Sequence, residues 1–125
     1  MANQYKGEIK GKLGDKERTF RLTFESIVNI ENRTNKSIMD ITNEIALQKY
    51  SLKDIVIIFN EALAGAGGKF TQASVGDMVM QTGLLKAAVL CSEVLMTVFT
   101  GNKTEEDSPL VQGENEQQNT QSSNT

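Results

Sequence analysis

The 125-residue chain contains no histidine, no tryptophan, one cysteine and one proline. A single cysteine, Cys91, cannot form an intrachain disulfide. Without histidine, the usual zinc, haem and catalytic-triad constellations are excluded or reduced to rare variants. The sequence therefore argues against an enzyme, and we expect no catalytic residues, no cofactor and no bound metal.

Three sequence features resemble parts of catalytic or ligand-binding sites, but a structural role explains each of them better. The glycine-rich stretch 65–68 before Lys69 follows a helical pattern and lacks the Lys-Ser/Thr pair of a phosphate loop, so a helix-ending hinge is favoured. Pairs of Asp and Glu lie at helical spacing among Asn and Lys, which favours a solvated face over a shared proton or metal. Cys91 lies in the most apolar segment, which favours a buried structural thiol over a nucleophile.

Long hydrophobic runs are also missing. The most apolar stretch, 84–99, is interrupted by two charged and two hydroxyl-bearing residues, so it is not expected to cross a membrane. The first ten residues contain no apolar signal-peptide core. These features predict a protein of a reducing cytoplasm without a membrane partner.

Charge is distributed unevenly along the chain. Residues 101–125 carry one lysine and five acidic residues (1 − 5 = −4), which leaves 12 − 11 = +1 for residues 1–100. Leu110 and Val111 are the only sizeable apolar residues of the 101–125 segment, so we expect it to be a disordered acidic polar tail. A near-neutral body is not typical of duplex nucleic-acid binders, and nucleic acid is not expected as a partner.

The hydrophobic pattern predicts a single α+β domain over 1–100, with a two-stranded antiparallel hairpin (5–24) packed on about five short helices (25–100). Apolar residues alternate with lysines from Tyr5 to Leu13, a turn is expected from Gly14 to Glu17, and a second strand is expected to run to Phe24. A hydroxyl-bearing residue precedes each of four predicted helices as its N-cap, and Asn35 and the glycines supply the ends. The predicted caps are Thr23, Ser37, Ser51 and Thr71.

The last predicted helix, 84–100, is apolar on most of its sides, which indicates a surface shared with a partner or another subunit. We expect a homo-oligomer. One stripe is assigned to the protein's own core and the other to partner binding, although periodicity leaves the opposite assignment open. The core stripe is Leu84, Ala88, Cys91 and Leu95, and the partner-binding residues are Leu85, Val89, Met96 and Phe99.

The hairpin carries three more basic than acidic residues. Lysines on strand edges commonly prevent edge-to-edge pairing, which is the favoured interpretation. Binding of an acidic protein segment or of single-stranded nucleic acid is the alternative.

Taken in order, these segments resemble the tail assembly chaperones of long-tailed phages and gene transfer agents, a family also labelled phage tail tube proteins of the gene transfer agent type. The resemblance covers about residues 5–100, and Asn35 stands where the family usually has glycine, an acceptable exchange at a helix end. The segments that carry it are 7–9, 20–24, 27–31, Ser37 with Ile38, 51–54, 62–67, and Gly76-Asp77 ahead of Gly83.

The resemblance implies a non-enzymatic chaperone that binds the tape measure protein and assists polymerisation of the tail tube protein. It further implies a location in the cytoplasm of the bacterial host or producing cell and absence from the mature particle. Two alternatives stay open. One is a structural tail component, either a tube or a tail-completion subunit, and the other is a small nucleic-acid-binding regulator that uses the basic hairpin.

Overall fold

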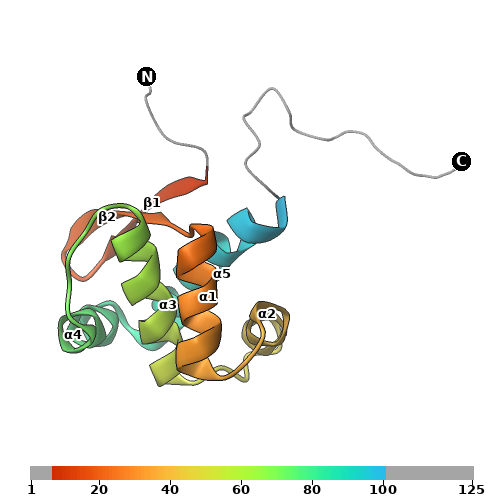
Figure 1. Cartoon of the computed structure of the whole chain (residues 1–125). Coiled ribbons are helices and arrows are strands. Elements are labelled where there is room, and N and C mark those ends of the chain that lie inside the picture. The colour runs from red at the N-terminus through yellow and green to blue at the C-terminus, as the bar shows by residue number, and fades with distance from the viewer. Residues whose placement is uncertain (1–6, 101–125) are drawn as a thin grey trace, which may run out of the picture.

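A computed structural model describes residues 7–100, which form a two-stranded sheet and five helices (Figure 1). The predicted α+β class, with its N-terminal hairpin packed on helices, is confirmed. Tyr5 and the predicted acidic tail over 101–125 lie outside the described residues. The elements are β1 (Glu8–Leu13), β2 (Lys16–Arg21), α1 (Phe24–Thr34), α2 (Ile38–Ala46), α3 (Leu52–Gly65), α4 (Gln72–Thr82) and α5 (Leu84–Thr100).

The hairpin is shorter than its sequence pattern suggested. Strands β1 and β2 pair antiparallel through a two-residue turn that begins at Gly14, whose φ of 75° is a conformation that glycine adopts without steric cost. The turn expected to continue to Glu17 was therefore wrong, because Lys16 and Glu17 already pair with β1. The second strand also stops before Phe24, which begins α1 and is 83% exposed.

Local capping chemistry explains where the first four helices begin. All four predicted N-caps are confirmed, since each side-chain oxygen accepts a hydrogen bond from the backbone N–H three residues later. Asn35 ends α1 in the left-handed conformation, with φ 59°. The capping distances are 3.0 Å for Thr23, 3.0 Å for Ser37, 3.1 Å for Ser51 and 3.0 Å for Thr71.

Helix α3 forms the centre of the fold and packs on β2, α1, α4 and α5. Its side chains from Ile55 to Phe59 are all buried, and the Phe59 ring lies 5.3 Å from the Phe20 ring of β2. Figure 1 shows α1 beside α3, with α4 and α2 on opposite sides of this pair and α5 behind it. The hairpin thus packs on one side of α3 and buries Phe20 there, because a two-stranded hairpin is only marginally stable by itself.

The contact between α3 and the hairpin is close enough to require glycine. A Cβ atom at Gly65 would overlap the carbonyl oxygen of Arg21 and would lie 2.9 Å from Ser26 Oγ. Gly76, within α4, has no such neighbour within 4 Å. Two helical glycines of the same chain therefore have opposite steric surroundings.

We predict that Gly65→Ala lowers the free energy of unfolding by about 1–3 kcal/mol, because backbone must move to admit the methyl group. Gly76→Ala should raise it by about 0.5–1 kcal/mol through better helix propensity. Denaturant unfolding of both variants measures the two effects. Equal changes in the two variants would contradict the close α3–hairpin contact.

Candidate partner-binding groove

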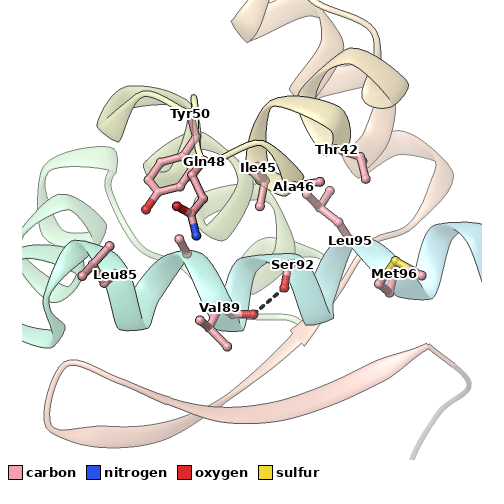
Figure 2. Close-up of a pocket in the computed structure, with 11 residues that line it drawn as sticks. Thr42, Ile45, Ala46, Gln48, Tyr50, Leu85, Val89, Ser92, Leu95 and Met96 are labelled. Atoms are coloured by element: carbon pink, nitrogen blue, oxygen red, sulfur yellow. Dashed lines mark hydrogen bonds between the residues drawn. The ribbon is translucent and has the colours of Figure 1, made fainter.

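A groove of about 550 Å³ runs between α5, α2 and the loop that follows α2 (Figure 2). Helix α5 supplies one wall and the short side chains of Thr42 and Ala46 on α2 face it. Gln48 and Tyr50, from the loop, lie above the Leu85 end. The α5 residues that line the groove are Leu85, Ala88, Val89, Ser92, Leu95 and Met96.

The side chains assigned to partner binding from the sequence all lie on the exposed side of α5. Leu85 is 76% exposed, Val89 62%, Met96 49% and Phe99 41%. Together with Ser92 they follow one another at intervals of three or four residues, so they form a single stripe along the helix. The groove contains all of this stripe except Phe99, which continues it toward the end of α5. We call these five residues the α5 stripe.

The core assignment holds for three of its four residues. Ala88, Cys91 and Leu95 are buried, whereas Leu84 is 37% exposed, so placing Leu84 in the core was wrong. Leu84 is the first residue of α5, directly after Gly83, where the helix end is only partly covered. The sequence analysis did not assign three other buried residues of this helix, Ala87, Leu90 and Val94.

The hairpin decides which face of α5 is inside. Leu90 lies directly over β1, since a Cβ atom at Gly11 would be 2.5 Å from Leu90 Cδ1. The other flank is partly covered by α2, which leaves the α5 stripe between the two. This arrangement could not be read from a helix that is apolar on most sides.

The α2 wall, formed by Thr42 and Ala46, was not predicted from the sequence. Thr42 and Ala46 are one helical turn apart, and this spacing of small side chains is a weak signal that another element approaches closely. Only the tertiary structure places α2 along α5. The polar residues that line the groove were likewise not predicted from the sequence.

Two of the three hydroxyl groups that line the groove, those of Thr42 and Ser92, already donate hydrogen bonds within their own helices. Thr42 Oγ1 donates to Ile38 O at 2.8 Å, and Ser92 Oγ donates to Val89 O at 2.8 Å. Covering these side chains with apolar atoms leaves neither donor unpaired. The groove therefore suits the apolar face of another protein segment.

An ion-pair network holds the start of α2 against α3. Lys36 Nζ lies 2.7 Å from Asp54 Oδ2 and 2.9 Å from Glu44 Oε1, and Asp54 is buried. Hydrogen bonding to Asp54, and secondarily to Glu44, raises the pKa of Lys36 above its ordinary value of 10.5. Glu31 adds a second tether by accepting a hydrogen bond from the Ile38 N–H at 2.9 Å.

Three basic residues of the hairpin, Lys12, Arg18 and Arg21, have groups of the same hairpin or of the loop at Phe70 beside them. The strand register sets Lys12 opposite Glu17 and Glu8 opposite Arg21. Arg18 donates from Nε to Leu13 O at 2.9 Å, and its guanidinium lies 5.3 Å from the centre of the Phe70 ring. Acidic residues thus lie opposite two of the basic ones, and this mixture of charges favours the interpretation that they prevent edge-to-edge pairing.

Cys91 is fully buried, and desolvation raises the pKa of its thiol far above the ordinary value. Among residues 7–100, no group of three or more His, Cys, Asp or Glu could hold a metal ion. No single helix within that range is long and apolar enough to cross a membrane, and α4 with α5 passes the length and composition test only as a pair bent by 116°.

The fold and the groove thus define a small α+β protein whose most prominent surface feature is apolar. A family model described as "Phage tail tube protein, GTA-gp10" matches residues 6–101, and the chain belongs to this family. It is therefore a tail protein of the phage and gene transfer agent type, which confirms the resemblance at the level of the tail family. The description does not name a chaperone. Comparisons with curated proteins and with solved structures gave no match.

Replacing leucine by alanine once on each face of α5 tests which face is buried. Leu95→Ala should lower the free energy of unfolding by about 2–5 kcal/mol, because it leaves a cavity in the core. Leu85→Ala should change it by less than about 0.5 kcal/mol in dilute solution, because that side chain is largely exposed. Equal losses in denaturant unfolding would mean that the stripe is covered within the monomer.

The Lys36 network should show itself in the pH dependence of stability. Lys36→Met should lower Tm at neutral pH, because Asp54 loses its cationic partner while buried. Because the pKa of Lys36 is higher in the fold than its ordinary value of 10.5, the contribution of Lys36 to stability is complete below pH 10.5. It falls progressively as the pH rises through the raised pKa. The Tm difference between wild type and variant should therefore be constant from neutral pH to about pH 10.5 and shrink above it.

Lys53→Met provides the control for this prediction, since Lys53 is an exposed lysine of α3 directly before Asp54. Its Tm difference from the wild type should be small and should not follow that alkaline profile. A Lys36→Met variant that melted like Lys53→Met at every pH would show that the network does not stabilise the fold.

Proposed function

We propose that the chain is a structural component of a phage or gene transfer agent tail, either a tube or a tail-completion subunit, and that it acts by binding other protein chains. The match over residues 6–101 to a family described as a tail tube protein is the observation that carries this proposal. The role is non-catalytic. This reverses the order of the two functions expected from the sequence, where the chaperone came first.

The groove supports a role in protein contacts. Its walls are mostly apolar, the hydroxyl groups of Thr42 and Ser92 are bonded within their own helices, and the α5 stripe runs for about 21 Å at 1.5 Å per residue. A surface of this kind binds another chain by burying apolar area and requires no catalytic group. The contacts form in the cytoplasm of the producing cell, where tails assemble.

A second candidate function is the assembly chaperone, which would hold the tape measure protein and assist polymerisation of the tail tube protein. The apolar groove favours it, because an amphipathic helix of a client could lie in such a groove. The two functions differ in where the protein ends up. A structural subunit stays in the finished particle and a chaperone leaves it.

Quantitative mass spectrometry of purified particles tests the proposal. We expect the protein in stoichiometric amounts beside the known tail proteins, and its absence from particles that contain all other tail proteins would favour the chaperone. Co-expression with the tape measure protein then tests the second candidate. A chaperone should keep the tape measure protein soluble, and Leu85→Asp with Val89→Asp should abolish that effect, because charges would enter the apolar stripe.

A further inference from the structure

We propose that the groove is occupied by α5 of a second copy of this chain, packed antiparallel to the first about a two-fold axis near Ser92. The partner of the groove is then a second copy of the same chain. This rests on the proposed function only in that the groove binds protein. Four features of the described residues support a second copy over another occupant. They are the symmetry of the stripe, the small residue at its centre, the charges on one flank and the position where α5 ends.

The α5 stripe is nearly symmetric about its middle. Leu85 and Phe99 each lie seven residues from Ser92, while Val89 and Met96 lie three and four residues from it. An antiparallel partner helix crossing at Ser92 therefore meets apolar side chains at every level. Leu85 packs on the partner's Phe99, and Val89 packs on the partner's Met96.

The centre of the stripe permits close approach. Ser92 has the smallest side chain of the five, and its hydroxyl is already bonded to Val89 O at 2.8 Å. Two copies of this residue can therefore meet at the axis without leaving a donor unpaired. On α2, the short side chains of Thr42 and Ala46 leave room beside α5 for the second helix.

Charges on one flank favour the antiparallel direction. Lys86 and Glu93 are both exposed, lie one heptad apart on the same side of α5, and form no ion pair within residues 7–100. In the antiparallel pair, Lys86 and the partner's Glu93 are offset by about 8 Å along the axis, a spacing that long side chains bridge in coiled coils. The two-fold axis generates this contact twice. In a parallel pair the same flank of each copy would lie on opposite sides of the interface, so Lys86 would not meet the partner's Glu93.

The end of α5 adds a second match of charge. A small polar pocket at the start of α5 is lined by Lys12 and Lys86. In the antiparallel pair, the partner's α5 ends beside this pocket, so the negative end of its helix dipole faces these two lysines. The positive end of the α5 dipole lies in the same place.

The contact is of modest size. Only four exposed apolar side chains per copy contribute to it, so the buried area is small beside the about 1,000 Å² at which specific interfaces begin. We therefore expect a dimer that dissociates on dilution and is weakened by salt.

Charge reversal tests the arrangement in sedimentation velocity over a range of concentrations. Lys86→Glu and Glu93→Lys should each weaken dimerisation on the order of tenfold, because each converts two attractive contacts into repulsive ones. The double variant Lys86→Glu, Glu93→Lys should restore the affinity of the wild type. Failure of the double variant to recover, with all variants folded by circular dichroism, would overturn the proposed pairing.

Cross-linking tests the direction independently of charge. A mixture of Leu85→Cys and Phe99→Cys chains should form a disulfide-linked heterodimer under oxidation, whereas neither chain alone should link to itself. Wild type controls for Cys91, which is buried. Self-linking of Leu85→Cys alone would indicate a parallel pair and overturn the proposal.

A wild-type chain that stays monomeric at every concentration would also overturn the dimer, while the particle measurement decides the tail role separately. A tape measure fragment that binds the groove of a monomer and is not displaced by excess chain would identify a different occupant.

Discussion

The packing of α3 against the hairpin is the contact on which the rest of the structure depends. Gly65 lets the α3 backbone lie directly under the Arg21 carbonyl, and Phe59 meets Phe20 in the same layer. A two-stranded hairpin is marginally stable alone, so this contact both orders the strands and closes one side of the core. The position of β1 then follows from its pairing with β2, and β1 in turn selects the face of α5 that is buried.

Helix α5 illustrates how a small domain can be left with an uncovered apolar surface. Its inner face is covered by the hairpin, α3 and α4, and α2 covers only one flank. The side chains from Leu85 to Phe99 along the stripe therefore stay exposed, although they are as apolar as those of the core. Covering them within this fold would require another helix, which residues 7–100 do not contain. A contact with a further protein chain is the physical alternative.

This surface connects the fold with the family. The structural role proposed for this tail protein would use the uncovered apolar surface as a contact with another chain. The Lys36 network gives the α2 wall a fixed position despite the few apolar residues that α2 contributes, since Ile41 and Ile45 are its only buried side chains. Because α5 and α2 are both held in place within the domain, the groove can stay open without a bound partner.

The sequence by itself determined the local features of this protein, namely the four N-caps, the left-handed end of α1 at Asn35, the helical segments and the hairpin. Each of these depends on side chains that act on backbone within a few residues. The tertiary structure alone decided that Leu84 is exposed, that Leu90 lies on Gly11, and that Thr42 and Ala46 form the second wall of the groove. The physical reason is that α5 is apolar on most of its sides, so its burial is set by contacts between residues far apart in the chain.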